Sequence, residues 1–147
     1  MIRTVLMVCV GNICRSPMAE YILRQELKDI RVLSAGLDAL VGHPADESAI
    51  RVAAEFGLDI SSHHAQQING ALVSGADLIL AMEGSHKHEI IRRHPFASGK
   101  VFRLGEHEDF DVPDPYRKSL DHFVDSFQLI RRGVKLWTPR IRALARF

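Results

Sequence analysis

The sequence lacks the features that mark membrane, secreted and nucleic-acid-binding proteins. The apolar run near its start, residues 5–10, is far too short to span a bilayer, and no basic segment with a long apolar stretch predicts a signal peptide. Lysine and arginine number 19 against 18 aspartates and glutamates, and a net charge of +1 gives no strong positive field. We therefore expect a cytoplasmic protein without membrane insertion and without a nucleic-acid partner.

Cysteine is also scarce, because Cys9 and Cys14 are the only two. A single pair cannot build a cysteine-rich zinc site, and a small secreted disulfide scaffold would contain more. Histidine does not indicate a metal either, since His86 and His88 are two positions apart on an expected helix and face different ways. We expect no metal and no cofactor. The two cysteines are either small core side chains or reactive groups.

The chain of 147 residues, 46% hydrophobic and 25% charged, suits one globular domain that needs no disulfide or metal to fold. Its patterns predict strands at 4–9, 30–35, 77–82 and 100–104, and helices at 16–28, 46–56, 85–94 and from 119 onward. We expect Ser16 and Ser85 to cap helices, and Pro139 to kink the last one. This alternation predicts an α/β protein whose ligands bind beyond the carboxyl ends of parallel strands.

The loop after the first strand carries the strongest functional signal. It is followed by Ser16-Pro17 and reads Cys9-Val10-Gly11-Asn12-Ile13-Cys14-Arg15. Gly11 and Asn12 tolerate positive φ, which lets successive backbone N–H groups turn inward around an anion. The start of the following helix adds donors and partial positive charge, and Arg15 offers a planar fork to two phosphate oxygens.

The same donors surround the sulfur of Cys9. A thiol beside a helix N-terminus and an arginine ionises more readily than a free thiol, so we expect Cys9 to be a thiolate near neutral pH. This pattern indicates a nucleophile within a phosphate cradle. Ser16 could donate a hydrogen bond to the thiolate, cap the helix, or do both. Asn12 could instead be a plain turn residue.

An attacking thiolate needs an acid that protonates the departing oxygen. The best candidate is Asp114, which lies between Pro113 and Pro115 in the loop before the last helix. The two prolines restrict the backbone and can hold the carboxyl group at a set distance from the nucleophile. Asp111 is the rival acid, but it has no adjacent proline. Alternatively, Asp114 could belong to a solvated Asp-Pro turn that has no catalytic role.

These residues resemble the low-molecular-weight protein-tyrosine phosphatases. Residues 9–17 are similar to that family's phosphate-binding signature and residues 114–116 to its general-acid motif, and the similarity covers essentially the whole chain, including 34–36. The resemblance implies one domain over residues 1–147, a three-layer α/β/α fold with a four-stranded parallel sheet in the order 2-1-3-4. It also implies phosphotyrosine hydrolysis through a cysteinyl-phosphate on Cys9. Arg15 would bind the phosphoryl oxygens, and Asp114 would act first as acid and then as base.

The resemblance also implies supporting roles for other residues. The implied phosphate-binding loop consists of Val10, Gly11, Asn12, Ile13, Cys14, Arg15 and Ser16, and the residues that would support it are Asn12, Ser16, Ser34 and His63. Leu40 and Tyr116 are candidate walls for an aromatic ring at the substrate rim. Cys14 would trap an oxidised nucleophile as a reversible disulfide, and a small buried residue under the loop is the alternative.

Residues 38–42 and 112–119 most resemble the bacterial branch, whose members dephosphorylate tyrosine autokinases that control capsule or exopolysaccharide assembly. The resemblance thus implies a membrane tyrosine autokinase as substrate, and we expect a monomer. Two positions depart from the family, because Gln66 stands where an arginine is common and Arg117 replaces a second tyrosine of animal relatives. The related arginine phosphatases tend to carry threonine at the position of Ile13, which argues against phosphoarginine.

Two other functions compete with this prediction. One class of arsenate reductase shares the fold and a similar oxyanion loop, but it passes oxidation on to further cysteines, and this chain has none after Cys14. A phosphotyrosine-binding protein without catalysis would need neither a thiolate nor a positioned acid such as Asp114. Phosphatase chemistry explains both features, and we expect a mildly acidic optimum because Cys9 must be ionised while Asp114 stays protonated.

Overall fold

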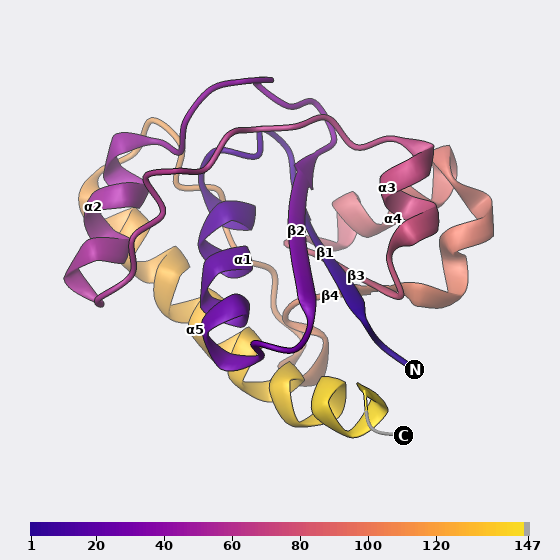
Figure 1. Cartoon of the computed structure of the whole chain (residues 1–147). Coiled ribbons are helices and arrows are strands. Elements are labelled where there is room, and N and C mark those ends of the chain that lie inside the picture. Colours follow the sequence, from indigo (N-terminus) through magenta and orange to yellow (C-terminus); the bar gives the residue numbers. More distant parts are fainter. Residues whose placement is uncertain (146–147) are drawn as a thin grey trace.

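Strands and helices alternate along the chain in a computed structural model that describes residues 1–145 (Figure 1). The strands are β1 (Thr4–Cys9), β2 (Arg31–Gly36), β3 (Leu78–Ala81) and β4 (Val101–Arg103). The α-helices are α1 (Arg15–Glu26), α2 (Glu47–Glu55), α3 (Gly70–Gly75), α4 (Gly84–Arg93) and α5 (Leu120–Ala145), and the 3-10 helices are η1 (Pro95–Lys100) and η2 (Glu106–Glu108). All strand pairs are parallel, in the order β2-β1-β3-β4, which confirms the predicted sheet.

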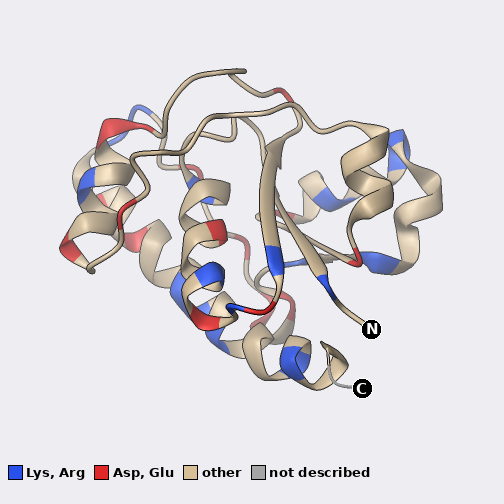
Figure 2. Ribbon diagram, in the orientation of Figure 1, with Lys and Arg blue, Asp and Glu red and all other residues tan. Residues whose placement is uncertain are grey.

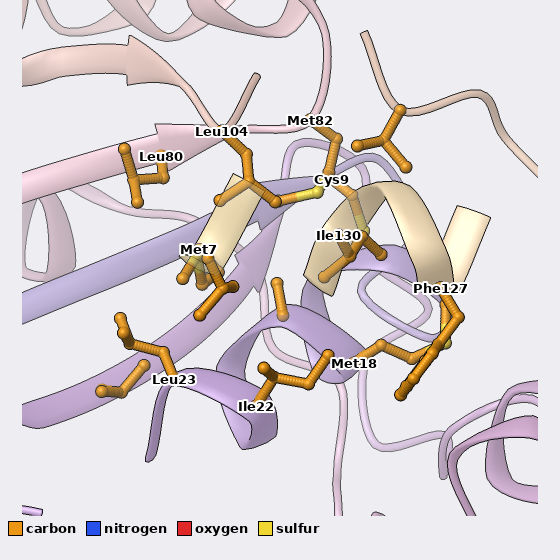
Figure 3. Close-up of a cluster of buried hydrophobic side chains, with 14 of the residues drawn as sticks. Met7, Cys9, Met18, Ile22, Leu23, Leu80, Met82, Leu104, Phe127 and Ile130 are labelled. Atoms are coloured by element: carbon orange, nitrogen blue, oxygen red, sulfur yellow. The ribbon is translucent and has the colours of Figure 1, made fainter. Parts of the chain in front are cut away.

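The central strand β1 separates two hydrophobic cores, because successive side chains of a strand point to opposite faces. Val5, Met7 and Cys9 face α1, α2 and α5, whereas Leu6 and Val8 face the side of α3 and α4. Figure 1 shows these helix groups on the two faces of the sheet, so the molecule has the expected three layers. Figure 3 shows side chains of β1, β3, α1 and α5 meeting in the larger core.

The loop after β1 lies where the chain changes direction across the sheet. From β1 the chain passes to β2 on one side and later returns to β3 on the other, so this loop lies at the topological switch point. Backbone bonds tie it to the segment after β2: Leu37 donates to the carbonyl of Cys9, Asp38 to that of Val10 and Leu40 to that of Gly11. The two segments therefore form one wall of the site.

A glycine at the end of β2 permits this close approach. A Cβ atom at Gly36 would lie 2.4 Å from the carbonyl oxygen of Val10, which no side chain could tolerate. Gly36 also pairs directly with Cys9 in the parallel register. The glycine in the Ser34-Ala35-Gly36 segment is thus required for a steric reason, because it lets β2 lie against the loop after β1.

The predicted helix caps were wrong at two positions. Helix α1 begins at Arg15 with Cys14 as its N-cap, and α4 begins at Gly84 with Glu83 as its N-cap, and neither cap residue makes a side-chain capping bond. The backbone becomes helical before Ser16, so its hydroxyl is free for another role. The last helix continues through Pro139 to Ala145. The short helices α3, η1 and η2 were not predicted.

Within residues 1–145, no helix combines the length and the hydropathy that a membrane crossing requires.

Candidate active site

Asn12 is the central bracing residue of the loop between β1 and α1. It is fully buried and has a φ of 59°, a left-handed conformation that asparagine tolerates better than most residues. Its Nδ2 donates to Ser16 Oγ at 2.8 Å and to Ser34 Oγ at 2.9 Å, while its Oδ1 accepts from the backbone N–H of Gln66 at 2.9 Å. A plain turn residue would not need this buried network, so the structure favours a supporting role.

Ser16 connects this network to the cysteine. Its Oγ lies 2.8 Å from Cys9 Sγ, and both side chains are buried. Because Asn12 already donates to this oxygen, the hydroxyl hydrogen of Ser16 is available to the sulfur. Ser16 thus contacts the Cys9 sulfur rather than capping the helix.

A buried carboxylate that sequence analysis missed completes the support. Ser34 Oγ donates to Glu20 Oε1 at 2.5 Å, and Glu20 also pairs with Arg24. Burial raises the pKa of Glu20, opposed by the hydrogen bond from Ser34 and the charge of Arg24. The available signal was the spacing, because Glu20 follows Ser16 by four positions and falls on the same face of α1.

His63 supports the loop from a different segment. Its Nε2 lies 2.6 Å from the backbone carbonyl oxygen of Asn12, and its Nδ1 lies 3.9 Å from Glu20 Oε1. Burial lowers the pKa of His63, and its hydrogen bond to Asn12 partly opposes this shift. A neutral ring that donates through Nε2 satisfies the Asn12 carbonyl without adding a positive charge beneath the loop.

Arg15 is fixed by partners at the carboxyl edge of the sheet. Its Nη1 donates to Glu83 Oε2 at 2.5 Å and to the carbonyl oxygen of Val112 at 2.8 Å, and the side chain is buried. Glu83, which sequence analysis also missed, directly precedes α4 and follows the buried strand β3 by two positions. His86 Nε2 lies 3.5 Å from Glu83 Oε2, and burial together with Arg15 lowers the pKa of His86.

Most of the predicted residues line a small cavity of about 200 Å³, and the four predicted supporting residues, Asn12, Ser16, Ser34 and His63, do not. Leu40 and Tyr116, the two predicted walls, both line it and are 39% and 37% exposed, as residues at a rim should be. Asp38, which was not predicted, also contributes. The complete lining is Cys9, Val10, Gly11, Ile13, Cys14, Arg15, Asp38, Leu40, Asp114 and Tyr116.

Asp114, rather than its rival Asp111, faces this cavity. Asp114 Oδ2 lies 3.9 Å from Arg15 Nη2, and its Oδ1 accepts from the backbone N–H of Tyr116 at 3.0 Å. The carboxylate of Asp111 instead accepts from the backbone N–H of Gly84 and from the guanidinium of Arg103. Asp111 is thus committed to structural contacts, and Asp114 remains the better candidate acid.

The two positions that depart from the family's sequence pattern, Gln66 and Arg117, have different structural consequences. Gln66 keeps a bracing role, because its backbone N–H binds Asn12 and its Nε2 donates to the carbonyl oxygen of Ser34 at 2.9 Å. Arg117 has a φ of 62° and places its guanidinium 5.2 Å from the centre of the Tyr116 ring. The rim thus gains an exposed cation next to its aromatic wall.

Cys14 lies in the same loop as Cys9, and both thiols are buried and free. Burial raises the pKa of the Cys14 thiol well above its ordinary value, and the nearby Asp46 and Cys9 reinforce the shift. Cys14 therefore stays protonated at neutral pH, in contrast to the role expected of Cys9. Among residues 1–145, no group of three or more histidine, cysteine or acidic side chains is placed to hold a metal ion.

A buried cysteine, an arginine and a carboxyl group around one cavity at the switch point of a parallel sheet define a cysteine-dependent phosphatase. The family model described as low molecular weight phosphotyrosine protein phosphatase matches residues 4–146, and the chain belongs to this family.

Individual relatives agree with the family model. The chain is 60% identical over 144 residues to a probable low molecular weight protein-tyrosine-phosphatase EpsP of Ralstonia nicotianae, covering 98% of this chain and 99% of the relative. It is 43% identical to the phosphatase Wzb of Escherichia coli K12, covering 97% and 98%. A structure of Vibrio vulnificus Wzb in complex with benzylphosphonate superimposes with a TM-score of 0.93 at 42% identity, covering 95% of this chain and 99% of that one.

Replacing Asn12 tests the bracing network. Asn12→Ala should lower the free energy of unfolding by about 2–4 kcal/mol, because it strains a left-handed backbone and leaves buried groups without partners. Asn12→Gly loses the same hydrogen bonds but relieves the backbone, so it should be more stable than the alanine variant by about 1 kcal/mol. Urea denaturation measures both values. Equal stability of the two variants would show that Asn12 is not needed for the left-handed turn.

Proposed function

We propose that this protein hydrolyses phosphotyrosine monoesters through a cysteinyl-phosphate on Cys9. The thiolate sulfur attacks phosphorus while Arg15 binds two phosphoryl oxygens, and Asp114 protonates the departing phenolic oxygen. Asp114 then takes a proton from the water that attacks the phosphoenzyme, which releases phosphate and restores the thiolate. The observation that carries this proposal is the placement of all three side chains around one cavity, with Ser16 Oγ 2.8 Å from the sulfur.

The shape of the cavity favours an aromatic phosphoester. Its lining is mainly apolar, and Leu40 and Tyr116 stand at the rim, where they can contact the two faces of a phenyl ring. The similar Wzb is described in complex with benzylphosphonate, which combines a phenyl ring with a phosphonate group. An alkyl phosphoester such as phosphoserine would leave this apolar rim without a partner.

A protein substrate would meet positive charge beside the cavity. Arg117 and Lys118 are exposed, and Figure 2 shows positive charge in the loop that leads into α5. Because the relatives bear the names EpsP and Wzb, we include in the proposal a membrane tyrosine autokinase of exopolysaccharide assembly as the substrate. A monomer suffices for the chemistry, since every proposed residue belongs to one chain. Two free cysteines agree with a reducing cytoplasm.

Protection by Cys14 remains part of the proposal. If the Cys9 sulfur is oxidised, a disulfide with Cys14 would prevent further oxidation, and a thiol could later reduce it. Both cysteines line the same cavity and are free, which supports the pairing. The protonated state of Cys14 agrees with a role as a reserve thiol rather than a second nucleophile.

A substrate panel without added metal tests the proposal. We expect hydrolysis of phosphotyrosine peptides with kcat/KM at least about 100-fold above that of phosphoserine or phosphoarginine peptides, since only the first fits the aromatic rim. Chelator in the assay should not change the rates. Preferred hydrolysis of phosphoarginine, or a requirement for a divalent metal, would contradict the proposed function.

A further inference from the structure

The candidate acid is positioned by the backbone that precedes it. The Asp114 side chain is 51% exposed, and it accepts a hydrogen bond from the N–H of Tyr116, two residues further along the same loop. By contrast, contacts from three other parts of the fold hold residues 109–113. The residues that fix this segment therefore determine where the Asp114 carboxyl group lies relative to the sulfur.

Arg103, at the end of β4, holds the beginning of the segment. Its Nη2 donates to Asp109 Oδ1 at 2.5 Å, and its Nη1 donates to Asp111 Oδ1 at 3.3 Å. Asp109 has a φ of 53°, so this ion pair fixes a residue in a left-handed turn. Trp137 of α5 donates to the backbone carbonyl of Arg103 at 3.2 Å, which anchors the arginine itself.

The middle of the segment is bound to the sheet edge. The Asp111 carboxylate that Arg103 contacts also accepts from the N–H of Gly84, at the start of α4. Val112 donates to the carbonyl of Met82 at 2.9 Å and accepts from Arg15. Arg103 therefore acts on the same stretch of chain as the phosphate-binding arginine.

Ser126 holds the residue directly before the acid. It is buried in the second turn of α5, and its Oγ donates to the carbonyl oxygen of Pro113 at 2.8 Å. That carbonyl belongs to the peptide group that joins Pro113 to Asp114. The hydrogen bond from Ser126 therefore fixes the orientation of this peptide plane, and with it the position of Asp114. An alanine at this position would remove the bond and little else.

We propose that Arg103 and Ser126 are positioning residues that place Asp114 for proton transfer to the leaving group. This inference rests on the proposed function, in which Asp114 is the acid. Neither residue lines the cavity, so they act on the reaction through the segment that carries Asp114.

Leaving-group dependence gives the test, because a poor leaving phenol needs the acid and p-nitrophenol hardly does. We would measure kcat/KM for phenyl phosphate and p-nitrophenyl phosphate with the wild type, Arg103→Met and Ser126→Ala. Each variant should lose about 5–20-fold with phenyl phosphate and less than about 2-fold with p-nitrophenyl phosphate. Arg103→Lys, which keeps the charge, should restore part of the loss. Equal losses with both substrates, or no loss with either, would overturn the inference.

Double variants separate positioning from general damage. In the Asp114→Asn background, Arg103→Met and Ser126→Ala should cause no further loss, because the group that they position no longer donates a proton. The same loss in that background would overturn the inference. Arg92→Met is the matched control, because it removes an exposed arginine that pairs with Glu89 on α4. If Asp114→Asn itself showed no dependence on the leaving group, the proposed function would fail instead, at its assignment of the acid.

Discussion

Cys9→Ser should lower kcat/KM for phosphotyrosine hydrolysis by at least about 10⁴-fold, because it replaces the only proposed nucleophile. A serine hydroxyl is a far weaker acid than a thiol and a far weaker nucleophile. Its hydrogen-bond neighbour, the Ser16 hydroxyl, is too weak a base to activate it. Initial rates at enzyme concentrations high enough to detect the residual activity measure the loss.

Binding should survive the same substitution. The loop N–H groups and Arg15 remain, so Cys9→Ser should bind benzylphosphonate within about tenfold of the wild type, as measured by calorimetry. Cys14→Ser is the matched control, because it makes the same chemical change in the same buried loop and should cost less than about tenfold in kcat/KM. Substantial activity in Cys9→Ser would exclude the cysteinyl-phosphate mechanism.

Asp114→Asn should lower kcat/KM for phenyl phosphate by about 10²–10⁴-fold, the usual contribution of a positioned general acid. The amide keeps the shape and the acceptor for the Tyr116 N–H but cannot release a proton to the phenolic oxygen. In the wild type, kcat/KM should vary little between good and poor leaving phenols, and in the variant it should fall steeply for the poor ones. Rates for a series of aryl phosphates measure both effects.

Asp111→Asn separates the two acidic residues of this loop. Its carboxylate contacts Gly84 and Arg103 rather than the cavity, so the variant should lose less than about 20-fold in kcat/KM for phenyl phosphate. If Asp111→Asn instead lost about 10²-fold or more with phenyl phosphate but not with p-nitrophenyl phosphate, Asp111 would be the acid.

Sequence patterns predicted the parts of the site that lie close together in the chain. The loop from Cys9 to Arg15 follows directly from an apolar strand, glycine and asparagine at the turn, and a helix start. Its position at the sheet edge followed from the alternation of strands and helices, and the resemblance supplied the strand order. The structure confirms the sheet and brings Asp114 to the same cavity, 99 positions after Arg15.

The partners that were missed depend on contacts between distant segments. Glu83 meets Arg15 only because β3 and β1 are neighbours in the sheet, and Glu20 meets Ser34 only because α1 packs beside β2. A single acidic residue in a helix or after a strand resembles an ordinary surface charge in the sequence. Tertiary packing gives it a buried partner, and no local pattern records that partner.

The error at Ser16 has a similar physical origin. A serine before proline at a helix start is typical of an N-cap, so the local pattern favoured that role. In the structure, the hydroxyl bonds to both Asn12 and Cys9, and the helix begins at Arg15 without a side-chain cap. The hydrogen bonds of Ser16 to Asn12 and Cys9 thus replace the helix cap that the local sequence favours.

Direct detection of the phosphoenzyme tests the central claim that Cys9 is the nucleophile. Asp114→Asn, mixed with p-nitrophenyl phosphate and quenched in acid within milliseconds, should release one equivalent of p-nitrophenol in a burst, because the variant lacks the base for the second step. Mass spectrometry of the quenched protein should then find one phosphoryl group, on the peptide that contains Cys9. A phosphoryl group on another residue would contradict the mechanism. So would steady turnover with no covalent phosphoenzyme in either the wild type or Asp114→Asn.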